Sequence, residues 1–197
     1  MTKERSITGE FGLQFKTLLG IVVGLWVLEL IDIPLGGSLN RFGIHPREIS
    51  GLWGIVFAPF LHGDLLHLLS NTVPFVVLSW LIMLRETADW LMVTLIVGFI
   101  SGLGVWLVGQ PGSVHIGASG VIFGYFGFLL ARGYYERSFV SIAFSVLVTF
   151  LYGGLIFGVL PGQSGISWEG HLFGFIGGIV AAKLMSSPRK RPNNFDI

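Results

Sequence analysis

The sequence predicts an all-α membrane protein, a bundle of six transmembrane helices without a second domain. Of the 197 residues, 52% are hydrophobic and only 12% are charged, whereas a soluble domain is usually about one-quarter charged. Apolar runs of about 20 residues, the length that crosses a bilayer, recur along almost the whole chain. The 29 glycines agree with this reading, because small residues let membrane helices approach closely.

Six apolar segments are long enough to be spans. They cover residues 15–34, 65–84, 90–108, 116–131, 139–160 and 168–186. Together they predict one membrane domain over residues 1–197, which includes a short polar N-terminal segment (1–14) and a short basic C-terminal tail (187–197). The first run lacks a small-residue cleavage site after it, so we expect an uncleaved span and not a signal peptide.

The basic residues predict how these spans are oriented. If the chain crosses the membrane six times, ten of its twelve Lys and Arg residues fall on one side: Lys3, Arg5, Lys16, Arg85, Arg132, Arg137, Lys183, Arg189, Lys190 and Arg191. An excess of these residues marks the cytoplasmic side. We therefore expect a multi-pass protein of the cytoplasmic (inner) membrane with both termini in the cytoplasm and Arg41 and Arg47 outside.

The loop between the first two predicted spans, residues 35–63, is long for a compact bundle. Glycines and prolines interrupt it too often for a span, yet its aromatic residues make it too apolar for a free linker. We expect a structured loop partly sunk in the outer leaflet, with Trp53 near the interface.

Composition also excludes several classes of function. The chain has no cysteine, which rules out a disulfide framework, thiolate metal ligands and a cysteine nucleophile. Its net charge is +1, and no basic stripe with interleaved aromatics appears, so no nucleic-acid partner is expected. The expected surroundings are the lipid bilayer, and the oligomeric state is left open.

Polar side chains inside predicted spans are rare and by default indicate function. His67 and Asn71 open the second span and are four residues apart, so they lie on one helical face. Both can donate a hydrogen bond into the bundle interior. On their own, they are equally well explained as hydrogen bonds that hold the spans together.

Glycines predict that the fourth and sixth spans lie close together. They follow one face of the fourth span and, in the sixth, the face that carries His171: Gly117, Gly120, Gly124 and Gly127, then Gly174 and Gly178. Glycine faces permit close helix contact. If the two faces meet, His171 lies near Ser119 at the N-terminal end of the fourth span.

A serine and a histidine brought together in this way can perform hydrolysis. A serine hydroxyl is a weak nucleophile until a base takes its proton, and a neutral histidine is the usual base. The backbone N–H of Ser119, with His67 and Asn71, could stabilise the oxyanion that forms. The run before Ser119 is polar, so this span is expected to begin below the outer surface, beside a cavity that admits water.

Three short motifs carry these residues: His67-x-x-x-Asn71, Gly117-x-Ser119-Gly120 and His171-x-x-Gly174-x-x-x-Gly178. Their order, and their places in the second, fourth and sixth predicted spans, resemble the rhomboid intramembrane serine proteases of the bacterial six-helix type. The resemblance covers nearly the whole chain.

The resemblance implies a serine endopeptidase that cuts transmembrane helices of other proteins with a Ser119–His171 dyad and no cofactor or metal. It implies that His67, Asn71 and the Ser119 amide bind the oxyanion, that Gly117 shapes the loop beside them, and that Gly174 and Gly178 support the site. Phe123 stands where some members carry a tyrosine that stacks on the catalytic histidine. His62 matches a family histidine just above the site.

Two further segments share this resemblance. The first loop, with Arg47 and Trp53, is similar to the family's half-submerged loop. The fifth span occupies the position of the family's proposed lateral substrate gate, and it is rich in aromatic residues: Phe139, Phe144, Phe150 and Phe157.

Three other functions remain open. The chain could be a non-catalytic relative that binds transmembrane helices. His62, His67 and His171 could form a metal or proton site, although they lack a ligand-spacing signature. A transporter is a weaker alternative, because no inverted repeat is visible.

Three carboxylates have no assigned role. Glu169 lies two residues before His171 and should point elsewhere on a helix, so it is not expected to be a third catalytic member. Glu29 and Asp32, near the outer end of the first span, lack an obvious partner, although Arg41 or Arg47 could pair with them.

Overall fold

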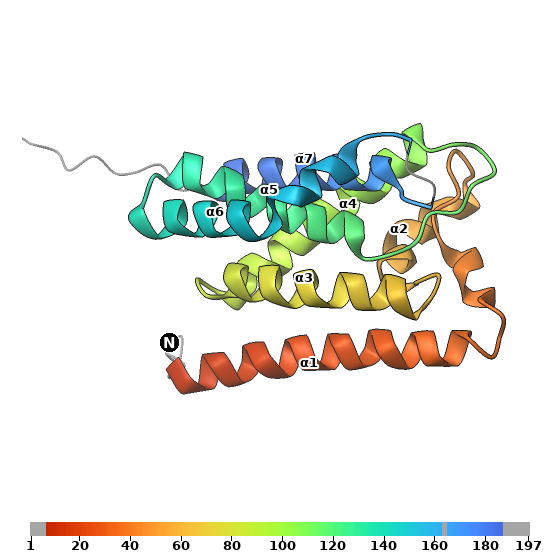
Figure 1. Cartoon of the computed structure of the whole chain (residues 1–197), viewed down its shortest axis with the longest axis horizontal. Coiled ribbons are helices and arrows are strands. Elements are labelled where there is room, and N and C mark those ends of the chain that lie inside the picture. Colours follow the sequence, from red (N-terminus) through yellow and green to blue (C-terminus); the bar gives the residue numbers. More distant parts are fainter. Residues whose placement is uncertain (1–6, 163–164, 187–197) are drawn as a thin grey trace, which may run out of the picture.

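The computed structural model describes residues 7–162 and 165–186, which form an all-helical bundle (Figure 1). Six longer helices run roughly along it: α1 (Ile7–Asp32), α3 (Leu65–Met83), α4 (Thr87–Val108), α5 (Ser119–Glu136), α6 (Phe139–Tyr152) and α7 (Trp168–Met185). The short elements are α2 (Gly54–Phe57) and the 3-10 helices η1 (Ser38–Phe42), η2 (Ser50–Trp53), η3 (Ala58–Phe60) and η4 (Gly153–Val159). The described ranges contain no strand, only an isolated bridge between Ile44 and His115.

Four helical segments are long and apolar enough to cross a membrane: Gly9–Asp32, Leu65–Met83, Thr87–Val108 and Phe139–Val159. The chain is therefore a multi-pass membrane protein. The expected count of six helices is not confirmed, because the described residues contain seven α-helices. The additional helix, α2, is one turn in the first loop. Helices α5 and α7, at the fourth and sixth predicted spans, have 18 residues each and are not among the four.

Several helix ends differ from the predicted boundaries. Helix α1 begins at Ile7, inside the predicted polar segment, because a helix can continue beyond its apolar part. Helix α5 begins at Ser119 and not at residue 116. The fifth predicted span changes at Gly153 from α-helix to 3-10 helix. Residues 1–6 and the predicted basic tail, 187–197, lie outside the described residues.

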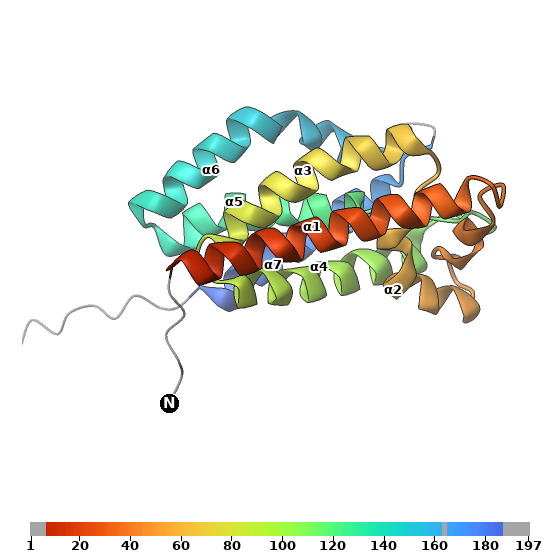
Figure 2. The ribbon, with the colours of Figure 1, turned by 90° about the horizontal axis from the view of Figure 1, so that it is seen from below.

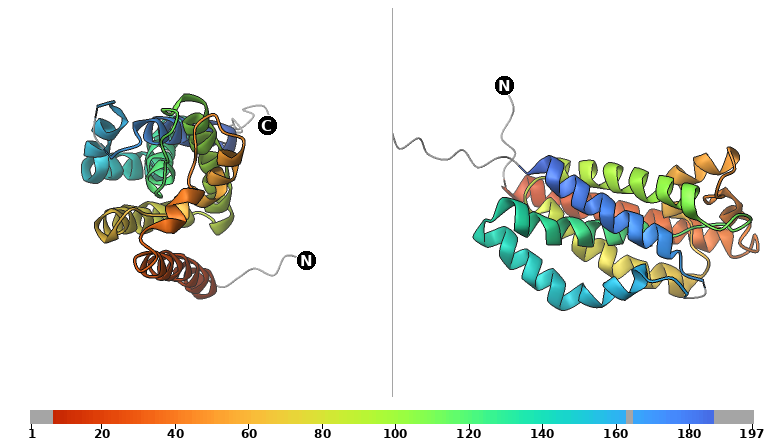
Figure 3. Two further views of the ribbon diagram at one scale, coloured as in Figure 1. Left: turned by 90° about the vertical axis from the view of Figure 1, so that its right-hand side faces the viewer. Right: turned by 90° about the horizontal axis from the view of Figure 1, so that it is seen from above.

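Helix α5 is the central element of the bundle. It contacts α7 most extensively and also touches α3, α4 and α6, an arrangement visible end-on in the left view of Figure 3. Helix α1 is peripheral and packs against α3, whereas α6 lies on the other side of α3 (Figure 2). The two helices that carry Ser119 and His171 therefore share the largest helix–helix contact.

The glycine faces of α5 and α7 make this contact. A Cβ atom on Gly174 would overlap the carbonyl oxygen of Gly120, and one on Gly178 would overlap that of Gly124. The predicted close contact of the two helices is confirmed, although the Cβ positions of Gly120 and Gly124 themselves point to Ser101 and Val97 of α4. The placement of Gly117 on the same helical face is wrong, because Gly117 precedes α5 and has a φ of +108°.

The first loop is folded onto the C-terminal end of α4, which confirms that this loop is structured. The Arg47 guanidinium donates to the Gly109 carbonyl at 2.8 Å, and the Trp106 indole donates to the Glu48 carbonyl at 2.7 Å. Backbone hydrogen bonds in both directions between Ile44 and His115, at 2.9 and 3.0 Å, then tie the loop to the segment before α5. The loop thereby holds the chain that leads into Ser119.

Candidate active site

Helices α3, α5 and α7 and the chain before α7 enclose a cavity of about 400 Å³. Its polar and aromatic lining includes most of the side chains that the sequence singled out: His67, Asn71, Ser119, Phe123 and His171. Ser119 is half-buried and lies in the first turn of α5. These side chains, far apart in the sequence, therefore share one space.

The ring of His171 is held on two sides. Its Nδ1 atom lies 2.9 Å from the carbonyl oxygen of Gly158 in η4. Phe123 stacks on it, with ring centroids 3.9 Å apart and an interplanar angle of 8°. A carbonyl oxygen can only accept a hydrogen bond, so Nδ1 carries the proton in the neutral ring. The lone pair is then on Nε2.

The N-terminal half of α3 supplies two further groups to the cavity. The Asp64 carboxylate caps this helix by accepting a hydrogen bond from the His67 backbone N–H at 2.7 Å. One turn further on, Asn71 is buried, and its side-chain nitrogen has no hydrogen-bond partner within the described part of the chain. A buried donor without an acceptor costs about 1–3 kcal/mol. This amide is therefore available to a ligand in the cavity.

Gly117 lies between these groups and Ser119. Its backbone N–H donates to the Ala58 carbonyl at 2.8 Å, which fixes the chain before α5 against the first loop. A Cβ atom here would lie 2.8 Å from Nε2 of His67. The positive φ and this close approach both require glycine.

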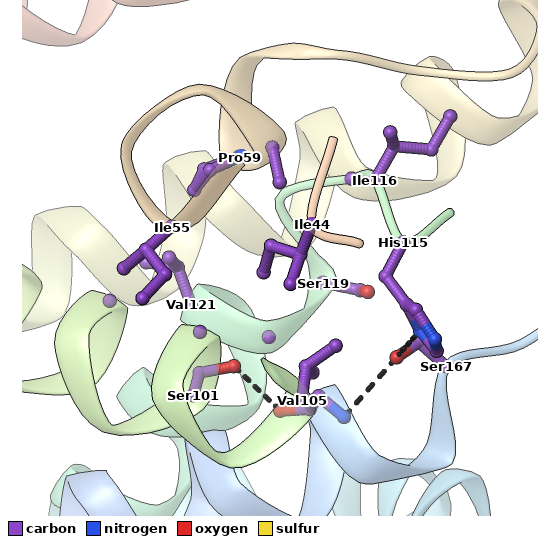
Figure 4. A pocket seen from close by; sticks show the side chains of 16 residues that line it. Ile44, Ile55, Pro59, Ser101, Val105, His115, Ile116, Ser119, Val121 and Ser167 are labelled. Atoms are coloured by element: carbon purple, nitrogen blue, oxygen red, sulfur yellow. Dashed lines mark hydrogen bonds between the residues drawn. The ribbon is translucent and has the colours of Figure 1, made fainter. Parts of the chain in front are cut away.

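A second, smaller cavity of about 40 Å³ also has Ser119 in its lining (Figure 4). Hydroxyl groups of Ser101 and Ser167 and the ring of His115 contribute to its wall. The Ser101 hydroxyl donates to the Gly170 carbonyl at 2.9 Å and so joins α4 to α7. A cavity of this size has room for about two water molecules, and its wall offers them polar partners.

Sequence reasoning missed a link between the loop before α5 and the start of α7. The His115 ring lies 2.7 Å from the Ser167 hydroxyl through Nδ1 and 2.8 Å from the Ser113 hydroxyl through Nε2. Ser167 caps α7, because its hydroxyl accepts from the Gly170 N–H at 3.3 Å. A serine just before the apolar run starting at Trp168 is a helix-start signal that could have identified it. Gly158 gave no such signal, because its carbonyl acts through the backbone.

The remaining candidates lie beside the cavity and not in it. His62 is buried next to His67, with ring centroids 5.0 Å apart. Glu169 is buried near His115. Among the described residues, no group of three or more His, Cys, Asp or Glu residues could hold a metal ion. The geometry therefore offers no support to the alternative metal site of His62, His67 and His171.

His62 makes the stability of the fold depend on pH. Burial, followed by the repulsion of a charged His67, lowers its pKa from 6.5 to about 4. The folded protein therefore binds fewer protons than the unfolded chain between these two values. Stability should fall as the pH drops from about 6.5 to 4, by up to about 3 kcal/mol.

We expect thermal unfolding in detergent to show this loss, and His62→Asn to remove most of it. Burial also lowers the pKa of His115, which Glu169 partly offsets, so a smaller slope of the same sign should remain. Equal slopes for the parent and His62→Asn would contradict the assignment.

Comparison with known proteins places this chain in a family. Residues 50–188 match the Rhomboid domain. An uncharacterized protein of Mycobacterium tuberculosis is 43% identical over 183 residues, which cover 89% of this chain and 76% of that protein. The putative rhomboid protease YdcA of Bacillus subtilis is 30% identical over 142 residues, 71% of this chain and 70% of that protein. Rhomboid-like protease 5 of Toxoplasma gondii is also 30% identical, over 68% of this chain but only 16% of its own length. The chain therefore belongs to the rhomboid family.

Proposed function

We propose that this protein is an intramembrane serine endopeptidase that cuts transmembrane segments of membrane proteins. The observation that carries the proposal is the shared cavity of about 400 Å³, which Ser119 and His171 line together with His67 and Asn71. Family membership supports it, because one relative is named a putative rhomboid protease.

His171 acts as the base in this proposal. With Nδ1 bonded to the Gly158 carbonyl, Nε2 accepts the proton of the Ser119 hydroxyl while its oxygen attacks the substrate carbonyl carbon. The Gly158 carbonyl and the stacked Phe123 ring hold the imidazole in this orientation, the task that a carboxylate performs in a triad. His171 then gives the proton to the leaving amine.

The negative oxygen of the tetrahedral intermediate needs hydrogen-bond donors. The backbone N–H of Ser119 lies in the first turn of α5, where backbone donors have no partner within the helix. The unpartnered side-chain nitrogen of Asn71 and the ring of His67 line the same cavity. Such preorganised donors stabilise an oxyanion strongly in a site of low dielectric constant.

Water must then release the acyl group from Ser119. The small cavity with Ser119 in its wall (Figure 4) offers a place for it, next to the hydroxyls of Ser101 and Ser167. His171 takes a proton from the water, whose oxygen attacks the acyl carbon, and the proton returns to the Ser119 oxygen as the ester bond breaks. No cofactor takes part in these steps.

The proposed membrane arrangement has six spans. Helices α5 and α7 add to the four apolar segments, because 18 residues extend about 27 Å and Gly174 and Gly178 of α7 pack directly on the backbone of α5. Arg85 and Arg132 form ion pairs, at 2.6 and 2.9 Å, with Glu136, the last residue of α5. Figure 1 shows this end of α5 remote from the first loop. The positive-inside rule puts this end in the cytoplasm of a cell whose inner membrane holds the protein. The site then opens to the extracytoplasmic side.

Substrates would reach the cavity beside α6. Its aromatic side chains Phe139 and Phe150 are strongly exposed, as expected of a helix that borders the lipid. The 3-10 helix η4 continues directly from α6, and its residues, such as Phe157, line the cavity itself. A substrate helix must locally unwind to present its carbonyl, so small or helix-breaking residues near the cut should help.

A fluorophosphonate probe tests the proposal against its alternative, a non-catalytic relative that binds transmembrane helices. We expect the probe to label the parent protein at Ser119, and Ser119→Ala and His171→Ala to remain unlabelled. Ser50→Ala, which alters an exposed serine of the first loop outside both cavities that contain Ser119, should be labelled like the parent. Absence of labelling in the parent would favour the helix-binding alternative.

A further inference from the structure

A separate cavity of about 660 Å³ lies between the end of α1, the loop that follows it and the start of α3. It is open to the surface, and its polar lining consists of Glu29, Asp32, Asn40, His62 and Asp64. None of the residues that line it is a lysine or an arginine. The catalytic steps proposed above use none of these side chains.

Three carboxyl groups line this cavity, and among the described residues no lysine or arginine side chain in its lining balances them. Glu29 and Asp32 are only 5% and 4% exposed, and among the described residues neither forms an ion pair. The expected partners are engaged elsewhere: the Arg47 guanidinium donates to the Gly109 carbonyl, and that of Arg41 lies over the Phe42 ring at 4.9 Å. Neighbouring buried carboxylates repel each other, and a bound cation would relieve this cost.

Two further groups in the lining lack partners. His62 is 1% exposed, and neither of its ring nitrogens has a hydrogen-bond partner among the residues that the structure describes. The buried side-chain oxygen of Asn40 has none either. Buried polar groups are nearly always hydrogen-bonded in native proteins. These groups are therefore available to a ligand that fills the cavity. They indicate a ligand site separately from the evidence of the carboxylates.

The cavity adjoins the candidate active site. The rings of His62 and His67 meet edge to face, with centroids 5.0 Å apart. The backbone N–H of Gly63, which also lines the acidic cavity, points to Nδ1 of His67 at 3.4 Å. A polypeptide that lies in the Ser119 cavity and continues across the start of α3 would carry its next side chains into the acidic cavity.

We propose that this cavity binds a lysine or arginine side chain of the substrate, in the segment just outside the membrane. The inference rests on the proposed protease function and adds a charge preference to it. A cavity of about 660 Å³ suits a long side chain, and no set of three metal-ligating side chains among the described residues favours a metal ion. An ammonium or guanidinium group would satisfy the carboxylates and Asn40 together.

The test uses reporter proteins with one transmembrane span. In a series of reporters, lysine is placed at each position of the outer segment in turn. Each lysine reporter is compared with a reporter that carries glutamine at the same position. The vesicles contain phosphatidylglycerol and phosphatidylcholine, which have no primary amine. At one or two positions we expect the parent protein to cut the lysine reporter with a KM about tenfold lower, as one added charge-assisted contact predicts. In the double variant Glu29→Gln/Asp32→Asn, the ratio of the KM for the glutamine reporter to the KM for the lysine reporter should fall to about one.

Because both KM values of a pair are measured with the same variant, a general loss of folded protein does not change their ratio. Glu48→Gln, which changes an exposed carboxylate of the same loop outside the cavity, should keep the ratio of the parent. Equal KM values for every pair in the parent would overturn the proposal, and so would a preference that persists in the double variant. A third outcome would assign the site to a lipid headgroup instead. In that case added phosphatidylethanolamine would change the cleavage rate only when Glu29 and Asp32 are present, and no reporter would be preferred.

This design separates the two claims. If the parent cuts the glutamine reporters, the protease function stands whatever the charge preference shows. If no reporter is cut and Ser119 does not react with the fluorophosphonate, the protease function fails and the substrate site fails with it.

Discussion

His171→Ala is expected to lower kcat for cleavage of a transmembrane reporter by about 10³-fold or more, with little change in KM. The histidine transfers a proton in both chemical steps of the proposed mechanism, and general acid–base catalysis of this kind contributes about 10²–10⁴-fold to a rate. It also activates the nucleophile, so the loss should be at the upper end of that range. The change should appear in kcat, because the interaction is made in the transition state.

His45→Ala is a suitable matched control. His45 is a histidine of the first loop whose ring nitrogen lies 2.9 Å from the Arg41 carbonyl, outside both cavities that contain Ser119. We expect a change in kcat of less than threefold. A similar loss in both variants would mean that His171 matters only for folding, and it would contradict the proposed role.

Gly178→Ala is expected to destabilise the bundle by at least about 2–3 kcal/mol and to remove activity. The added methyl group would overlap the Gly124 carbonyl oxygen and lie 2.6 Å from the Phe128 backbone nitrogen. Backbone atoms cannot move aside as a flexible side chain can, so α5 and α7 must separate. Overpacking a tight contact typically costs 1–3 kcal/mol or more, and the separation would also move His171 away from Ser119.

Gly24→Ala provides the control for this variant. It adds the same methyl group to a helix, but nothing lies within 4 Å of the new atom. Because alanine favours helix more than glycine does, stability should be unchanged or rise by up to about 1 kcal/mol. Thermal unfolding of both variants in detergent measures the difference, and equal melting temperatures would refute the close packing of α5 on α7.

The sequence was sufficient where a residue type has one dominant use. Glycines repeated along two apolar segments predicted that these helices would meet, and the contacts of Gly174 with Gly120 and of Gly178 with Gly124 confirm it. Polar residues in apolar segments pointed to His67 and Asn71, and both line the cavity that also contains Ser119. Lipid-facing positions favour apolar residues strongly, so each exception carries information.

The sequence was insufficient where backbone geometry decides. Gly117 was expected on the helical face of α5, yet it lies before the helix in a left-handed conformation that periodicity does not reveal. The Gly158 carbonyl bonded to His171 leaves no trace in the residue pattern. The links of Arg47 to Gly109 and of His115 to Ser167 join residues far apart in the chain, which local reasoning does not reach. Glu29 and Asp32 stand out in the sequence as carboxylates near the end of an apolar segment, but only the folded structure shows the cavity around them.

The most direct test of the central claim, that Ser119 is the nucleophile of a protease, is cleavage of a single-span reporter in proteoliposomes by the parent protein and by Ser119→Ala. The products are identified by mass spectrometry. The proposed function predicts that the parent cuts the reporter at a bond in or near the outer part of its transmembrane helix and that Ser119→Ala yields no product. Cleavage at the same bond and rate by Ser119→Ala would contradict it.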